Sequence, residues 1–176
     1  ESPEDVIEGA FRSIEAALVS DILEAIMQQS PAFFERLVVQ LLLAMGYGDS
    51  FDESGSVTPL SNDWCIDCVI REDKLGFENI YIQAKRWDLN ASVGRPDLQA
   101  FVGALTGTGA TKGLFITTAR FSKSALQFAS MQHAIKLVLV DGDQLARLMA
   151  AHNVGVSVRH TYEIKGIDRD YFDIGD

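Results

Sequence analysis

Three polar residues, Asp67, Gln83 and Lys85, lie in two short segments that have the composition of β-strands. The runs 64–71 and 77–85 are rich in β-branched and aromatic residues, and the turn-like segment between them contains a glycine, so they predict a hairpin. Because side chains alternate along a strand, Gln83 and Lys85 share one face. A carboxylate and an amide oxygen can hold Mg²⁺ against a phosphate, while an ammonium orients water or stabilises developing charge. The trio indicates metal-dependent phosphodiester hydrolysis, although the spacing alone also fits a solvated strand end.

Four stretches of the chain, taken in order, resemble the catalytic domain of Mrr-type restriction endonucleases: 81–87, 93–105, 112–122 and 139–149. The resemblance covers residues from about Pro31 to Phe172. That family belongs to the PD-(D/E)xK nuclease superfamily, and it replaces the usual acidic residue before x-K by glutamine, as Gln83 does here. The resemblance implies an α/β fold with a restriction-endonuclease-like core, in which helices flank a central mixed β-sheet, and an added N-terminal helix.

The resemblance also implies an active site. Asp67, Gln83 and Lys85 would be catalytic, with Asp67 and Gln83 as ligands of Mg²⁺, for which Mn²⁺ is a substitute. Glu35, on the preceding helix, would support them. Residues 59–68 contain no glycine, whereas the family is rich in glycine there, and this departure bears on the shape of the loop before Asp67.

Glu35 lies in a helix that we expect over residues 31–45. Ser30 is a suitable N-cap before a proline, and Gly46 is a suitable stop. On a helical wheel Glu35 falls among valine and leucine positions, where a carboxylate needs a partner. It is interpreted either as a water-mediated metal ligand or as a helix-edge glutamate paired with a nearby base.

The expected DNA contacts come from basic and polar side chains after the catalytic strand. Arg86 and Arg95 lie in a loop of exposed-looking composition, and Lys123 begins a later helix. Gln99 matches a glutamine of the family and is either a water-orienting residue or an ordinary surface residue. Thr117, Thr118 and Ser122 are interpreted either as a phosphate site or, for Ser122, as an N-cap.

The charge distribution is compatible with a nucleic-acid partner in spite of a net charge of −10. Residues 1–50 hold nine acids against two bases, a net of −7, whereas residues 79–136 hold seven bases against two acids, a net of +5. Because Lys and Arg supply most of the affinity for DNA, we expect weak binding that falls as salt rises.

The remaining pattern predicts one globular catalytic domain over residues 30–176, preceded by an N-terminal helix or linker over 1–29. The first helix is expected over 3–28 with Ser2 as its cap and an apolar stripe that includes Val6, Ile7 and Ile14. Further elements are expected as helices at 96–105, 122–133 and 143–151, strands at 113–118 and 136–140, and an edge strand at 154–165.

Two cysteines and no secretory or membrane-spanning segment indicate a cytoplasmic protein without a membrane partner. The Cys65-x-x-Cys68 spacing is a poor zinc or redox site, because residues three apart on a strand face opposite sides. The chain begins with Glu, and Mrr-like proteins commonly carry a winged-helix DNA-binding domain before the catalytic one, so a separate reader of the target is expected to precede it.

The leading functional prediction is a Mg²⁺-dependent deoxyribonuclease that cuts double-stranded DNA in the restriction of foreign DNA, methylated DNA included. Cutting both strands favours a homodimer or a higher homo-oligomer. Two alternatives remain open from the sequence. One is a repair or junction-resolving nuclease on the same fold; the other is a catalytically silent DNA-binding or assembly module in which the altered loop closes the site.

Overall fold

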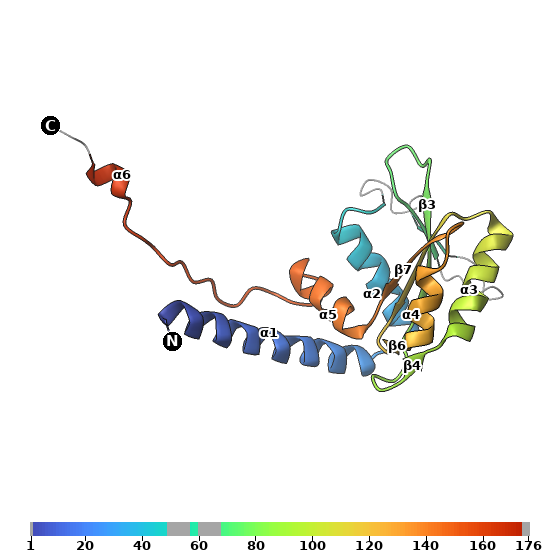
Figure 1. The fold of residues 1–176 in the computed structure, drawn as a ribbon, viewed down its shortest axis with the longest axis horizontal. Coiled ribbons are helices and arrows are strands. Elements are labelled where there is room, and N and C mark those ends of the chain that lie inside the picture. Colours follow the sequence, from blue (N-terminus) through green and yellow to red (C-terminus); the bar gives the residue numbers. More distant parts are fainter. Residues whose placement is uncertain (1, 49–56, 60–67, 174–176) are drawn as a thin grey trace.

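The computed structural model describes residues 2–48, 57–59 and 68–173, and within them the chain builds a five-stranded mixed sheet (Figure 1). In spatial order its strands are β1 (Val57–Pro59), β2 (Cys68–Arg71), β3 (Asn79–Lys85), β5 (Lys112–Thr117) and β7 (Lys136–Val140). β1, β2 and β3 are antiparallel neighbours, while β3, β5 and β7 run parallel. The expected hairpin and central mixed sheet are therefore confirmed.

Helices cover both faces of this sheet (Figure 1). They are α1 (Pro3–Met27), α2 (Pro31–Ala44), α3 (Arg95–Thr108), α4 (Lys123–Ser130) and α5 (Gly142–Ala151), while the short α6 (Arg169–Phe172) lies away from the sheet (Figure 1). Alternation along β5 divides the core, because Leu114 and Ile116 pack with α1, α2 and α5, whereas Phe115 packs with α3 and α4. The result is a helix–sheet–helix sandwich with two apolar clusters.

The helix boundaries follow their local signals. Ser2 and Ser30 cap α1 and α2 by accepting backbone hydrogen bonds, as predicted, and each helix has proline in its first turn. Gly46, with φ of 94°, follows the end of α2 in a conformation that favours glycine. Two short strands escaped prediction: β4 (Ser92–Val93) and β6 (Arg120–Phe121) form a separate parallel pair.

Most of the apolar stripe expected on α1 is not buried, although Leu18, at its end, packs against the core. Val19, Ile22 and Ile26, in the second half of the helix, enter the core. Val6 and Ile14 remain 54% and 67% exposed, because the first half projects beyond the sheet (Figure 1). The domain boundary expected at residue 29 stays a prediction, although α1 shares its buried face with α2 and α5.

The edge strand expected over 154–165 is wrong. This segment leaves α5 without forming a strand and leads out to α6, far from the sheet (Figure 1). Its residues alternate apolar and polar, but Val158 and Tyr162 are 70% and 87% exposed. Alternation of apolar and polar residues with a period of two is compatible with a strand, but a strand also needs a neighbouring strand with which to pair.

Candidate active site

Gln83 and Lys85 lie at the end of β3, where the strand is central in the sheet. β2 pairs with β3 on one side and β5 on the other, so Gln83 lies opposite Phe115 and Lys85 opposite Thr117. Gln83 is 1% exposed and Lys85 is half-buried. Ile82 and Ala84 face the α1–α2–α5 cluster, so the predicted alternation of β3 is confirmed. The predicted polar face is largely covered rather than open.

Asp67 lies outside the described residues, as do Cys65 and most of the glycine-poor segment 59–68. Cys68, bonded directly to Asp67, is buried and pairs with Ile82, which is bonded directly to Gln83. The assignments of Asp67, Gln83 and Lys85 as catalytic residues, and of Asp67 and Gln83 as metal ligands, stay predictions.

Glu35 does not have the apolar surroundings that the helical wheel indicated. The buried stripe of α2 consists of Phe34, Leu37, Val38, Leu41 and Leu42, and Glu35 is exposed beside it. The placement of Glu35 among apolar side chains is wrong, because the buried stripe turns the neighbouring positions inward and leaves Glu35 exposed. Since α2 packs against β3, a supporting role for Glu35 stays a prediction.

Thr117 and Thr118 are not an open phosphate site. They are 0% and 2% exposed, and their hydroxyls donate to the backbone carbonyls of Lys85 and Trp87. Ser122 accepts a hydrogen bond from the amide of Ala125 and is the N-cap of α4, as one interpretation had it. Consecutive threonines at the end of a buried strand were visible in the sequence, but their acceptors depend on strand order.

Arg86 is half-buried, and the expectation that its loop exposes it is wrong. Its Nη1 donates to the carbonyl oxygen of Met27 at 3.2 Å, at the last residue of α1. Its Nε is buried and has no hydrogen-bond acceptor among the residues that the structure describes. A cation at a helix C-terminus meets the negative end of the helix dipole, so Arg86 ties α1 to the strand that carries Lys85. A role in DNA binding stays a prediction.

Arg95, Gln99 and Lys123 are exposed and lie near the N-terminal ends of two helices. Arg95 and Gln99 lie on α3, and Lys123 is the first residue of α4. The guanidinium carbon of Arg95 is 5.3 Å from the centroid of the Phe128 ring on α4, in a cation–π contact that joins the two helices. These three side chains are accessible to a ligand, and their contact with DNA stays a prediction.

Lys112 contributes less to the basic surplus than the charge count indicated. Its ammonium pairs with the carboxylates of Glu72 and Glu78, which lie on either side of the hairpin turn. The hydrogen bonds that the ammonium donates to Glu72 and then to Glu78 raise the pKa of Lys112 above its usual value. Glu72 and Glu78 precede the window 79–136, which is why the count missed them.

Asp73 organises the hairpin turn, a role that sequence analysis missed. Its carboxylate accepts from the amides of Glu78, Leu75 and Gly76 at 2.8–2.9 Å. These bonds, led by the one from Glu78, lower the pKa of Asp73. The signal was present as an aspartate at the start of a turn that ends in glycine, and Gly76 has φ of 77°.

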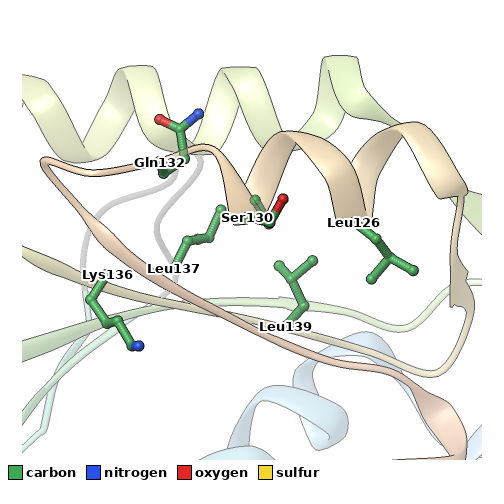
Figure 2. Close-up of a pocket in the computed structure, with 7 residues that line it drawn as sticks. Leu126, Ser130, Gln132, Lys136, Leu137 and Leu139 are labelled. Carbon is green, nitrogen blue, oxygen red and sulfur yellow. The ribbon is translucent and has the colours of Figure 1, made fainter.

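A groove of about 320 Å³ lies between α4 and β7 (Figure 2). It is lined by Leu126, Ala129, Ser130, Gln132, Lys136, Leu137 and Leu139. The predicted site residues do not line it, so the groove is separate from the end of β3. Within residues 2–48, 57–59 and 68–173, His, Cys, Asp and Glu form no cluster of three that could hold a metal ion. None of the helices described is long and apolar enough to cross a membrane.

The Mrr catalytic-domain family, described as a restriction endonuclease, matches residues 26–149, well over half of the chain. The chain belongs to this family. Its resemblance to Mrr-type catalytic domains is therefore confirmed, and the match includes both Gln83 and Lys85. Divalent-metal dependence is general among restriction endonucleases.

One curated relative is the "Type IV methyl-directed restriction enzyme EcoKMrr" of Escherichia coli. It is 44% identical over 172 residues, which are 98% of this chain and 55% of the relative. The chain thus spans about half the length of this relative.

Two solved structures share the fold. "DNA modification-dependent restriction endonuclease AspBHI" superposes with a TM-score of 0.58 at 14% identity, over 81% of this chain and 36% of that one. MspJI restriction endonuclease, solved in complex with a 27-mer oligonucleotide, gives 0.52 at 23% identity, over 78% and 31%. The restriction-endonuclease-like core is confirmed.

Proposed function

We propose that this chain is the catalytic domain of a metal-dependent DNA endonuclease that acts in the restriction of foreign, modified DNA. Membership of the restriction endonuclease family carries the proposal, because the match spans the strand that ends in Gln83 and Lys85. The methyl-directed activity named for the Escherichia coli relative supports methylated DNA as the substrate.

The proposed roles follow from the chemistry of each side chain. The carboxylate of Asp67 and the amide oxygen of Gln83 would hold Mg²⁺ or Mn²⁺, both of which prefer oxygen ligands. When bound, such an ion polarises the scissile phosphate and lowers the pKa of a bound water. The Lys85 ammonium, two residues after Gln83 on the same face of β3, orients the attacking water or stabilises the charge that develops on phosphate. Glu35 supports this site from α2.

Duplex DNA would lie across the N-terminal ends of α3 and α4. Arg95, Gln99 and Lys123 are exposed there. A helix N-terminus presents free amides and the positive end of its dipole, which favours phosphate. The solvent-exposed part of the half-buried Arg86 side chain would contribute at the edge of this surface.

Plasmid cleavage tests the proposal. Methylated and unmethylated supercoiled plasmid are incubated at low salt with Mg²⁺ or Mn²⁺, with EDTA as the metal control. Lys85→Ala should lower the cleavage rate by about 100-fold or more, the scale of losing one group that stabilises transition-state charge. Lys74→Ala is the matched control, because Lys74 is exposed in the turn at the opposite end of β3.

The outcomes separate the alternatives. Cutting that needs metal and Lys85 but tolerates Lys74→Ala supports the proposed site, and a preference for branched over methylated DNA redirects it towards repair. Equal rates for Lys85→Ala and the parent chain remove Lys85 from the mechanism. If the folded chain does not cut DNA and calorimetry detects no metal binding, the chain is a catalytically silent module.

Two further parts of the proposal concern assembly and location. Cutting both strands of a duplex takes two active sites, so the active form is a homodimer or a higher homo-oligomer. Sedimentation with and without DNA measures this. A cytoplasmic location accords with the low cysteine content.

A further inference from the structure

The backbone that carries Lys85 is held by the end of β5. The carbonyl oxygen of Lys85 accepts from the Thr117 hydroxyl at 2.7 Å and from the Thr118 amide at 3.3 Å. The carbonyl of Trp87 accepts from the Thr118 hydroxyl. Thr117, the last residue of β5, and Thr118, which follows it, therefore hold the point at which the neighbouring strand ends.

The residues that follow Thr118 then bind the end of the loop after β3. Arg120 and Ser122 donate their backbone amides to the carbonyls of Ala91 and Val93 at 3.1 and 3.0 Å. Residues 117–122 thus bind residues 85–93 at both ends. The shortest bond at the first of these anchors, at Lys85, comes from a side chain, whereas the last two anchors use only backbone amides, which any residue except proline supplies.

Thr117 has both hydrogen-bonding capacities of its hydroxyl engaged. It donates to the Lys85 carbonyl and accepts from the amide of Ala119 at 3.1 Å. It is fully buried, and it lies directly opposite Lys85 in the β3–β5 register. A buried hydroxyl with one donor and one acceptor bond has a single favourable orientation, so its contact helps to fix the direction of the Lys85 carbonyl, which also accepts from the amides of Trp87 and Thr118 at 3.1 and 3.3 Å.

We propose that Thr117 is a positioning residue for Lys85, which orients the Lys85 backbone and thereby the ammonium at the end of its side chain. The inference rests on the proposed function, in which Lys85 acts on the phosphate. Catalytic groups must be held to within about 0.5 Å of their working geometry by neighbours that are themselves locked. Thr117 is locked on both sides, and its bond to the Lys85 carbonyl is shorter than the one from the Thr118 amide.

A graded series at position 117 tests the hydroxyl. Thr117→Val keeps the shape and removes the hydroxyl, Thr117→Cys replaces it by a weak donor, and Thr117→Ser keeps it. Thr106→Val is the control, because Thr106 makes a comparable bond to the Val102 carbonyl at 2.9 Å on an exposed part of α3. For Thr117→Val, kcat should fall by about 10-fold to 100-fold, the usual loss for a displacement of about 1 Å, with KM nearly unchanged.

The rank order decides the inference. Thr117→Ser should restore most of kcat, Thr117→Cys should be intermediate, and Thr106→Val should match the parent chain. If Thr117→Val keeps the parent kcat, or if folded Thr117→Ser loses as much as Thr117→Val, the hydroxyl does not position Lys85. Should Thr117→Val fail to fold, the comparison of Thr117→Ser with Thr117→Cys decides instead, and equal kcat values for these two would overturn the inference.

A double-mutant cycle separates positioning from general loss of structure. In a Lys85→Ala background, Thr117→Val should leave the residual cleavage rate unchanged, because the group that it positions is gone. An equal fractional loss in both backgrounds overturns the inference. If Lys85→Ala itself cuts at the parent rate, the proposed function of Lys85 fails instead.

A readout without catalysis covers the case in which the chain alone does not cut. Reductive methylation with carbon-13 labels every lysine, and the NMR signal that Lys85→Arg removes is that of Lys85. Thr117→Val should shift this signal, whereas Thr117→Ser and Thr106→Val should leave it in place. An unmoved signal in a folded Thr117→Val protein shows that Thr117 does not control Lys85.

Discussion

The end of β3 and the projecting first half of α1 carry equally regular patterns and have opposite environments. At the end of β3, Gln83, Ala84 and Ile82 are all buried, and the carbonyl of Lys85 is held from β5. Along the projecting half of α1, Val6 and Ile14 recur at helical spacing and more than half of each remains exposed. A regular apolar spacing therefore coincides with burial in one region and with exposure in the other.

The two regions differ in burial because α1 is longer than the sheet is wide. A helix of 25 residues is about 37 Å long, whereas the sheet, with five strands, measures about 20 Å across. A single core can therefore cover only part of α1. Burial is set by where an element lies relative to the sheet, and periodicity alone identifies which face would be buried if a partner were present.

The largest difference in stability between the two regions is expected for the substitution of two phenylalanines. Phe115→Ala, at a ring that packs between Phe101 and Phe121, should lower the free energy of unfolding by about 3–5 kcal/mol. Phe11→Ala, at a ring 63% exposed on α1, should change it by no more than about 0.5 kcal/mol. Urea unfolding measures both. A loss of similar size at Phe11 would show that the projecting half of α1 is covered in solution.

Two glycines make a second contrast. A Cβ at Gly142 would lie 2.3 Å from the carbonyl oxygen of Thr118, so Gly142→Ala should destabilise the chain by about 1–3 kcal/mol. Gly9, within α1, has open space around it, and Gly9→Ala should be neutral or stabilising by about 0.5–1 kcal/mol. Thermal unfolding of the pair gives the sign, and a stabilising Gly142→Ala would contradict the close approach of α5 to β5.

The pH dependence of stability should distinguish the β2–β3 hairpin from the N-terminal end of α1. The pKa of Asp73 is lowered by amides of the turn, and that of Asp5 by the amide and hydroxyl of Ser2. A carboxyl with a lowered pKa stabilises the fold above its ordinary value of 3.8, and this contribution disappears as the pH falls through the folded-state pKa. Asp73→Asn should therefore destabilise at neutral pH and approach the parent chain in acid.

Asp5→Asn is the control for that experiment. Asp5 caps a helix end that lies outside the core, so its loss should increase hydrogen exchange in the first turn without moving the midpoint of global unfolding. A constant difference between Asp73→Asn and the parent chain at all pH values would mean that its carboxylate is not what orders the turn.

The smallest effect is expected for the C-terminal arm, residues 157–173. Removal of 158–176 should change the free energy of unfolding by no more than about 0.5 kcal/mol, because the arm's apolar side chains are exposed. Removal of 152–176 should cost more, since it also deletes Val154 and Val156, which pack against the α1–α2–α5 cluster. A clearly larger loss on removal of 158–176 would place the arm against the body of the protein.

Much of the fold was predictable because its signals are local. The caps at Ser2 and Ser30, the turn before Asn79 and the alternation along β3 all act within a few residues. The arm strand at 154–165 could not be judged in this way, since a strand exists only with a neighbour. The paired strands β4 and β6 have two residues each, which is too short for periodicity to register.

The residues of the candidate site were easier to predict from the sequence than their surroundings. The positions Gln83 and Lys85 followed from strand alternation and family resemblance, but the exposure of Glu35 and the burial of Arg86 depend on packing between α2, β3 and the end of α1. Thr117 drew attention as a strand-end hydroxyl. Its acceptor, the Lys85 carbonyl, is 32 residues away and is fixed only by the order of strands.

The parallel pairing of β3 with β5 has a consequence for the order of folding. The β2–β3 hairpin closes across a turn of a few residues, so it can form early, whereas β5 reaches β3 only after the α3 crossover has been laid down. Contacts that close long loops form late in folding. A partly folded or partly synthesised chain would thus contain Gln83 and Lys85 on a hairpin and still lack β5, so the proposed site would be assembled only after the later strand has paired.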